Sequence, residues 1–483
     1  MKKIMMILTA LGLCFSLCAC AAKENGGAAG ANEASGQSEA GVRGTDRQGV
    51  GQGNSGQESS GGENVGEQGT EGLYFLYRGD DRTGCYTEEG YYYLTEETEE
   101  LSDGSYGAHL MYMDFATQQE VYLCSNTACN HDTPDCTSVF LYEDFPSFST
   151  RIFIYKDMLY ILSKEYDTEG TVITSLAGDS EGEIESSPAV LYRANLDGTD
   201  REKVYTFDSD VTVEDLVLGD SSGIYLVTKK TETSKSGSST YTTSTDRNLI
   251  LVDVEKGTET KVCSLELNDD ISWKVRGCFD NKLVLEGVDY GKKMSAGEIM
   301  DDDGWKESYE NSSQVYALLA IDSGAYEEVY RVSNKELNSA EIKGNMMYIS
   351  NSGTGEIRSV DLLTGEEKTL CSLPQNSIYG MIGDKLCCYD WSGNKDYTFY
   401  YVDVNTGEIS HSSLVNKALG WSLEFRAELV DDVLVIYDYD YTPSDLQEDA
   451  YEINCYKYAL ISKEDLYAGV ANYRPIQMIG KGK

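Results

Sequence analysis

The sequence predicts an all-β fold, a single β-propeller of seven blades, because two short units recur along most of the chain. The first unit is a turn residue followed by a short apolar or tyrosine-rich strand. It begins at Gly90, Asp157, Gly223, Asn281, Asn345, Asp384 and Asp432. The second unit is a strand, an Asx-type turn and a returning strand, which together make a hairpin. Its copies begin at Leu110, Leu191, Leu249, Leu318, Ile357 and Tyr400.

The two units alternate, so each repeat supplies about four strands. Four-stranded sheets arranged around a ring protect their edges without helices, which is the construction of a propeller. The seven starts predict seven blades, although the spacing of the repeats also fits six or eight. A β-solenoid would need shorter and more uniform repeats. We expect the strand at 73–77, which precedes the first repeat, to close the ring by completing the last blade beside the C-terminal strands at 451–460.

The first twenty residues are typical of an export signal. Two lysines precede an apolar run over 4–17, which is too short to remain as a membrane anchor. The residues at 17–20, LCAC, resemble the lipobox of bacterial lipoproteins. This resemblance implies that residues 1–19 are a signal peptide and that the Cys20 thiol is diacylated. An ordinary cleaved signal with small residues at the cleavage site is the alternative.

Residues 20–71 are predicted to be a flexible linker that starts at the acylated cysteine. The stretch is rich in Gly, Ser and Glu and has no aromatic residue, so it cannot bury enough surface to offset the entropy of ordering. A coil of this length reaches about 40 Å. The predicted propeller occupies 72–483. These expectations place the protein on the extracytoplasmic face of the cell membrane, held there by lipid.

Net charge excludes two classes of partner. The chain of 483 residues has 82 acidic and 39 basic side chains, for a formal charge of -43. So acidic a surface repels phosphate, which argues against nucleic acid and against electrostatic docking on anionic lipid. It favours solubility and cationic partners, and we expect a monomer.

The hairpin units resemble those of extracellular propellers of the lipoprotein-receptor-related type. The whole layout of lipobox, linker and propeller resembles lipid-anchored propeller lipoproteins of clostridial bacteria. The resemblance implies the fold and the location, but it implies no reaction.

One loop, with the sequence CSNTACNHDTPDC, concentrates metal-binding residue types. Thiolate and imidazole are the ligands that zinc prefers, so Cys129, His131 and Cys136 are candidate ligands of a structural zinc ion, with Cys124 and Cys85 as further candidates. The spacing differs from standard zinc fingers. An exported protein also allows a disulfide, either between Cys129 and Cys136 or between one of them and Cys85. A third interpretation assigns the loop neither feature.

The assignment of Cys124 has a competing interpretation. Cys124 follows the hairpin residue Asp114 by ten positions, and Cys263 and Cys371 follow their own hairpin Asp residues by the same distance. The repeat therefore predicts a small buried side chain in a blade strand at all three positions.

An acidic segment at 301–304 suggests calcium, with Asp301 and Asp303 as candidate ligands, because this cation prefers oxygen ligands around a turn. The EF-hand pattern fails at its first position, and a solvated acidic loop is the alternative. Four tryptophans could form a sugar-binding platform, although packing between blades explains them more simply. They are Trp273, Trp305, Trp391 and Trp421.

No set of residues forms a complete catalytic constellation, so we assign no catalytic residue and expect a protein that is not an enzyme. The function predicted is a binding module for a protein, a peptide or a glycan. A carbohydrate-active propeller enzyme and an envelope scaffold protein are the alternatives.

Overall fold

The computed structural model describes residues 72–79, 84–145, 149–164, 188–236, 239–268, 270–291, 302–351, 353–390, 399–418, 420, 422–443 and 451–479. The chain divides into two units, Met1–Glu58 and Ser59–Lys483, and every described residue belongs to the second. The predictions for Cys20, the signal peptide and the linker therefore lie outside the described residues. Within the described residues, no helix combines the length and the apolar character needed to cross a bilayer.

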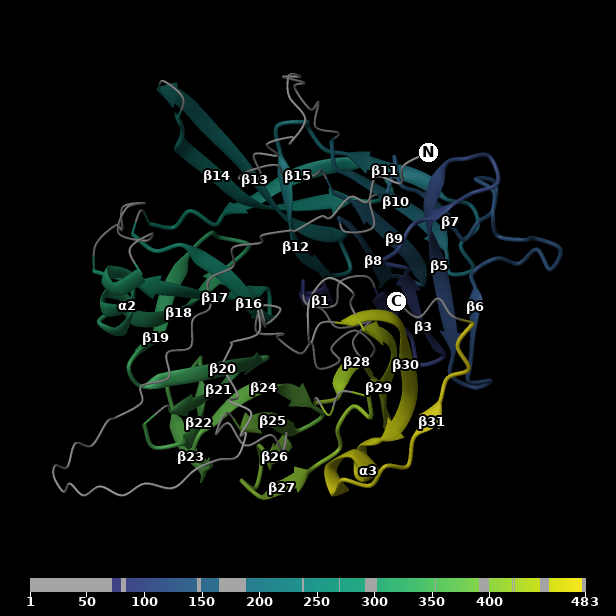
Figure 1. Ribbon diagram of the computed structural model, residues 1–483. Coiled ribbons are helices and arrows are strands. Elements are labelled where there is room, and N and C mark those ends of the chain that lie inside the picture. The colour runs from purple at the N-terminus through teal and green to yellow at the C-terminus, as the bar shows by residue number, and fades with distance from the viewer. Residues whose placement is uncertain are drawn as a thin grey trace, which may run out of the picture. The chain divides into compact units, whose positions relative to one another are not determined.

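The second unit is a β-propeller in which seven sheets follow one another around a ring (Figure 1). The prediction of seven blades is confirmed. Blade I holds β2 (Gly84–Tyr86), β3 (Gly90–Leu94), β5 (Tyr106–Asp114) and β6 (Gln119–Tyr122). Blade II holds β8 (Thr150–Tyr155), β9 (Met158–Ser163), β10 (Val190–Asn195) and β11 (Glu202–Thr206). Blade III holds β12 (Thr212–Gly219), β13 (Ile224–Ser236), β14 (Ser239–Asp253) and β15 (Thr258–Ser264).

The remaining four blades have the same antiparallel order. Blade IV holds β16 (Trp273–Phe279), β17 (Lys282–Asp289), β18 (Ser313–Ala320) and β19 (Tyr326–Ser333). Blade V holds β20 (Leu337–Lys343), β21 (Met346–Asn351), β22 (Glu356–Asp361) and β23 (Glu367–Ser372). Blade VI holds β24 (Asn376–Ile382), β25 (Lys385–Asp390), β26 (Phe399–Asp403) and β27 (Ile409–Ser412). Blade VII holds β28 (Glu424–Glu428), β29 (Asp432–Pro443), β30 (Tyr451–Ser462) and β31 (Arg474–Pro475).

The turn chemistry read from the sequence explains these strands. Each predicted start precedes or opens the second strand of a blade, and Asp157 and Asn281 take the positive φ angles, 59° and 58°, that such tight turns require. In the hairpins, the Asp side chain caps the turn. Asp361 Oδ1, for example, accepts hydrogen bonds from the backbone N–H groups of Leu363 and Thr364, at 2.8 and 3.2 Å.

The strand β1 (Tyr74–Tyr77) corrects one prediction. It does not complete blade VII. It pairs with β12 of blade III, so that this sheet has five strands, and it also contacts β8 and β16. The first strands of the blades lie nearest the axis, and Figure 1 shows β1 at the centre of the ring. Phe75 and Tyr77 are buried there. An apolar strand gains more free energy by filling the centre than it would on an exposed outer edge.

The ring closes instead through the segment that follows β31. Gln477 forms a parallel bridge with Gln119 of β6, and the N–H of Gln477 donates to the carbonyl of Gln118 at 2.8 Å. Blades I and VII also pack face to face, with Met111 and Met113 of β5 in the same core cluster as Leu434 of β29. Apolar packing and a few backbone hydrogen bonds therefore join the two ends of the propeller.

Successive strands run in opposite directions, so the connections between them alternate between the two faces of the propeller. The connections on one face are short, and many of those on the other are long. We call one the turn face: it carries the links from first to second and from third to fourth strands, such as 156–157, 280–281 and 344–345. These links are short, apart from the one that contains α3 (Lys463–Ala468). We call the other the insert face: it carries the remaining links, among them 164–189 and 290–312.

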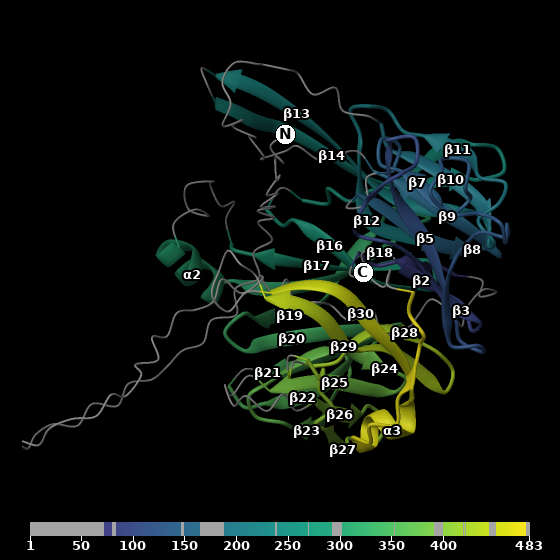
Figure 2. The same cartoon turned by 45° about the vertical axis from the view of Figure 1, so that its right-hand side comes forward.

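The insert face holds the additions to the basic blade. They include α2 (Asp302–Glu310) and the long hairpin of β13 and β14, both of which project to the left of the ring in Figure 2. In blade I, β4 (Glu99–Glu100) and β7 (Val139–Leu141) pair with the first half of β5 and form a small extra sheet. The loop between β6 and β7 contains the candidate metal ligands.

Candidate metal centre

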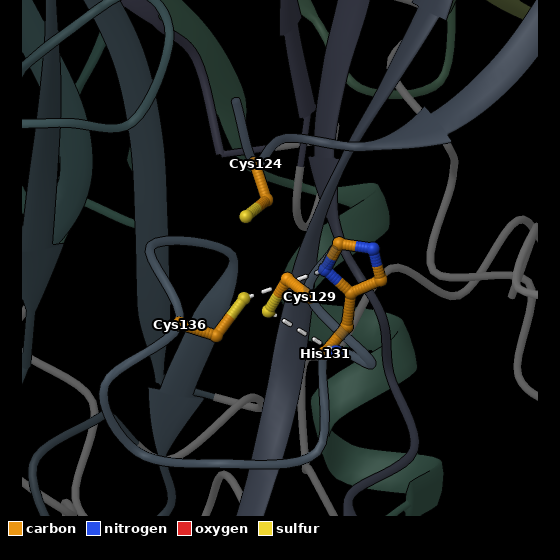
Figure 3. Close-up of side chains that lie close together, drawn as sticks. All are labelled: Cys124, Cys129, His131 and Cys136. Atoms are coloured by element: carbon orange, nitrogen blue, oxygen red, sulfur yellow. Dashed lines mark hydrogen bonds between the residues drawn. The ribbon is translucent and has the colours of Figure 1, made fainter. Parts of the chain in front are cut away.

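Three cysteines and one histidine of blade I converge on one point (Figure 3). The ligand atoms of Cys124, Cys129, His131 and Cys136 all lie within 4.8 Å of one another, and His131 Nδ1 is 3.4 Å from Cys136 Sγ. In a tetrahedral zinc site with bonds of about 2.0–2.3 Å, the ligand atoms are about 3.3–3.8 Å apart. The described residues contain no other such group. The four residues therefore fit a zinc ion after a small contraction.

Two turns bring these ligands together. The N–H of Cys129 donates to the Asn126 carbonyl and that of Cys136 to the Thr133 carbonyl, both at 3.0 Å. His131 lies between the two turns with a φ of 60°, a left-handed conformation that lets the chain reverse over a few residues. Cys124 approaches the cluster from the end of β6 and not from these turns. β6 ends at Tyr122, so the chain has already left the blade at Cys124.

The end of β6 explains how the two interpretations of Cys124 relate. Cys263 and Cys371 lie within the fourth strands β15 and β23, as the repeat predicts. Cys124 occupies the equivalent sequence position but lies beyond its strand, half-buried and beside the other ligands. At this repeat position, Cys263 and Cys371 therefore pack within their blades, whereas the Cys124 side chain points toward the candidate site.

Neighbouring side chains hold His131 in place. Tyr122 stacks on its imidazole, with ring centroids 4.2 Å apart and planes at 19°. His109 Nε2 donates to the His131 carbonyl at 2.8 Å, and the N–H of His131 donates to Cys129 Sγ at 3.3 Å. Tyr122 and His109 were not among the predicted site residues, since only their contacts in the fold connect them to the site.

An arginine of the next blade supports the segment that follows Cys136. The guanidinium of Arg201 donates to the carbonyls of Thr137 and Val139, at 2.7 and 3.3 Å, and lies over the ring of Phe140 at 3.9 Å. Burial lowers the pKa of Arg201 to about 10, so it stays charged at neutral pH. The loop is therefore anchored to blade II as well as to its own blade.

The environment also sets the protonation of the ligands. Burial lowers the pKa of His131, and the nearby His109 lowers it further, which favours the neutral imidazole that binds metals. Burial raises the pKa of Cys136 to about 11, so this thiol holds its proton at neutral pH until a metal replaces it. Leu101 and Val139 provide an apolar floor beside it.

The other predicted site residues lie elsewhere. Cys85 belongs to β2 and is buried in a core cluster with Tyr92 and Leu94, apart from the four converging residues. No disulfide joins the ten cysteines of the described residues. Asp301 lies outside the described residues. Asp303 lies in α2, so the segment expected to be an acidic loop is a helix there; carboxylates near a helix N-terminus favour this.

Among the four tryptophans of the suggested sugar-binding platform, only Trp273 has a described side chain. Trp273 lies at the start of β16 and is buried in the core cluster shared by blades III and IV. Trp305 belongs to α2, and Trp391 and Trp421 lie outside the described residues. Packing therefore accounts for Trp273.

Comparisons with known proteins agree with the fold and add no function. No family model and no curated protein matches the chain. Among solved structures, it resembles an oligogalacturonate lyase in complex with manganese, at 12% identity over 76% of this chain and 81% of that one, with a TM-score of 0.37. It also resembles puromycin hydrolase (10% identity, 83% and 55%, TM-score 0.45) and TolB from Acinetobacter baumannii (13%, 78% and 78%, 0.30). At these identities the likeness concerns the fold alone.

Proposed function

We propose that the protein is a lipid-anchored β-propeller on the extracytoplasmic face of the cell membrane, and that its insert face binds a protein or peptide partner. The observation that carries this proposal is the asymmetry of the connections. Short turns occupy one face, whereas the long links, the β13–β14 hairpin and the extra sheet of blade I all belong to the other. Loops presented by a rigid scaffold are the usual carriers of recognition.

The direction of β1 supports the same face. β1 is antiparallel to β12, and β12 runs from the insert face to the turn face. β1 therefore begins at the turn face, where the carbonyl of Leu73 accepts a hydrogen bond from Cys278 Sγ, 3.3 Å away near the end of β16. The chain that leads back to Cys20 thus joins the propeller on the turn face, and an anchor at Cys20 favours an outward-facing insert face.

The metal centre fits a structural role within this function. Four protein ligands fill a tetrahedral zinc site and leave no position open for water or a substrate, unlike the three ligands of a catalytic zinc. A zinc ion bound by Cys124, Cys129, His131 and Cys136 would hold the long link of blade I in one shape. A disulfide between Cys129 and Cys136 would leave the convergence of the other two residues without a purpose.

Zinc analysis of the purified protein tests the metal. We expect about one zinc ion per chain in the unmodified protein and loss of that ion in a Cys129→Ser, Cys136→Ser variant. A Cys263→Ser, Cys371→Ser variant is the control, because it removes the same number of thiols from strands that lie outside the cluster. Absence of zinc from all three proteins would refute a zinc site.

Cross-linking on intact cells tests the binding face. A lysine-directed reagent should join Lys230 of β13 and Lys306 of α2, both exposed on the insert face, to other proteins. Lys156 and Lys256 are exposed in links of the turn face and serve as controls. Cross-links that arise mainly from the turn face would contradict the assignment.

Intact mass of the membrane fraction, with a Cys20→Ala variant as control, tests the anchor.

A further inference from the structure

Blade I differs from the rest of the propeller in charge. Between Arg82 and Arg151 the sequence contains thirteen acidic residues and no lysine or arginine. This stretch includes all of blade I, its extra sheet and the metal loop. Cations approaching this blade therefore meet no repulsion from its own side chains.

The extra sheet of blade I has one face toward the metal centre and one toward solvent. Glu99 pairs with Gly107, and Gly107 pairs with Leu141 on the other side. Leu141 packs with the cysteines, and Glu99 lies 3.9 Å from His109, so this row faces the metal centre. Neighbouring rows of a strand point to opposite faces, so the next row must face away.

That next row consists of Glu100, Tyr106 and Tyr142. Glu100 is opposite Tyr106 in the β4–β5 pair, and the N–H of Tyr142 donates to the Tyr106 carbonyl at 2.9 Å. Tyr106 is 53% exposed and Tyr142 is 39% exposed, while Glu100 is also exposed. We call these three residues the tyrosine platform. Two large aromatic side chains are thus presented side by side, with a carboxylate in the same row.

We propose that the tyrosine platform docks a basic segment of a partner protein, with a lysine or arginine side chain on the tyrosine rings. This inference rests on the proposed binding function and names its surface and partner. Aromatic faces attract guanidinium and ammonium groups, and carboxylates around them strengthen the attraction. A sugar would also stack on tyrosine, but a neutral sugar gains nothing from the absence of basic residues and an acidic one is repelled. The charge of blade I therefore favours a cationic peptide.

A metal ion bound at the candidate centre would make the platform more rigid. Its ligands lie directly behind the sheet, and Arg201 fastens the same segment to blade II. A surface that is already ordered loses little conformational entropy when a partner binds. The structural metal and the recognition surface are then two sides of one small sheet.

Fluorescence anisotropy with a labelled hexa-arginine peptide tests the platform. The full chain is titrated at about 0.15 M salt, with a hexa-glutamate peptide as the charge control. We expect a Tyr106→Ala, Tyr142→Ala variant to raise the Kd about tenfold, because two ring contacts with a cation are lost. Tyr106→Phe with Tyr142→Phe should keep the affinity within about twofold, since the rings remain.

The matched control is a Tyr326→Ala, Tyr441→Ala variant, whose two tyrosines are each 42% exposed and lie in blades IV and VII. It should bind as the unmodified protein does. Equal affinity of the platform variant and the unmodified protein, equal binding of both peptides, or no binding of the arginine peptide overturns the platform. Thermal melting of each variant shows that it is folded.

Zinc content measured on the same samples separates this proposal from the metal centre. Protein with zinc that does not bind the arginine peptide overturns the platform and leaves the metal centre standing. Protein without zinc that binds the peptide through Tyr106 and Tyr142 supports the platform and overturns the metal centre. Peptide binding with unchanged affinity in the platform variant overturns the assigned surface while it leaves a binding function in place.

Discussion

The carboxylate of Glu120 in β6 accepts a hydrogen bond of 2.6 Å from the backbone N–H of Ile479, which lies near the other end of the propeller. The same side chain, 1% exposed, accepts a second hydrogen bond from the hydroxyl of Tyr93. Glu120 therefore joins the last segment of the chain to the first blade, at the point where the ring closes.

We expect Glu120→Ala to lower the free energy of unfolding by about 2–4 kcal/mol, because the buried Tyr93 hydroxyl and the Ile479 N–H both lose a charged acceptor. The exposed neighbour Gln119, which bridges Gln477 through its backbone, offers the control variant Gln119→Ala. Chemical denaturation measures both. A Glu120→Ala protein as stable as this control would show that the closure depends on the backbone and apolar contacts alone.

The central strand should be as important as a blade strand. Phe75 is 2% exposed, and Arg78 lies over its ring at 4.1 Å. Phe75→Ala leaves a cavity in the middle of the ring and should cost about 3–5 kcal/mol. Tyr74→Ala, at a partly buried position of the same strand, should cost less. If β1 were only loosely attached to the propeller, both substitutions would have small and similar effects on thermal melting.

Removal of the metal should weaken blade I. A strong zinc chelator is expected to lower the melting temperature of the unmodified protein, because a ligand that binds only the folded state stabilises it. The chelator should have no effect on the Cys129→Ser, Cys136→Ser variant, which melts at the lower temperature from the start. Differential scanning calorimetry measures both proteins. An unmodified protein that melts identically with and without chelator would speak against the metal.

Zinc affinity should rise with pH. Burial raises the pKa of Cys136 to about 11, so in the metal-free protein this thiol is protonated at neutral pH and must release its proton when zinc binds. Each proton released strengthens binding about tenfold per pH unit below the pKa. Competition with a coloured chelator at two pH values measures the slope. An affinity that does not change with pH would mean that the thiols are not ligands.

Acid should weaken the contact between blades II and III. Burial acts to raise the pKa of Asp215 in β12, but Arg151 and Lys164, at 3.0 and 2.9 Å, outweigh it and hold the pKa below its ordinary value. A depressed carboxyl pKa stabilises the fold above the unfolded pKa of about 4, and the stabilisation is lost as the pH falls through the folded value.

The variant Asp215→Asn should therefore be less stable than the unmodified protein at pH 7 and should lose less stability between pH 5 and pH 2. Asp210→Asn, which affects an exposed ion pair with Lys230, is the control and should change little. Urea denaturation across the pH range measures all three proteins. An unchanged acid slope in Asp215→Asn would contradict the predicted role of this carboxylate.

The blades could be predicted from the sequence because their signals are local. Turn residues such as Asp157 and hairpin residues such as Asp361 act on neighbouring backbone groups, so the chain records them directly. The partner of β1 could not be predicted, since an apolar strand carries no mark of the strand with which it pairs. Cys124 was ambiguous for a similar reason: its role depends on where β6 ends, which packing decides.

The position of β1 also determines how the propeller would carry a mechanical load. A force applied to the chain before Leu73 acts along the length of β1, so the hydrogen bonds to β12 are strained together and not one after another. Phe75 and Tyr77, both buried, would have to slide past the inner strands at the same time. A pull on this end of the chain would therefore load the propeller at its axis, through β1.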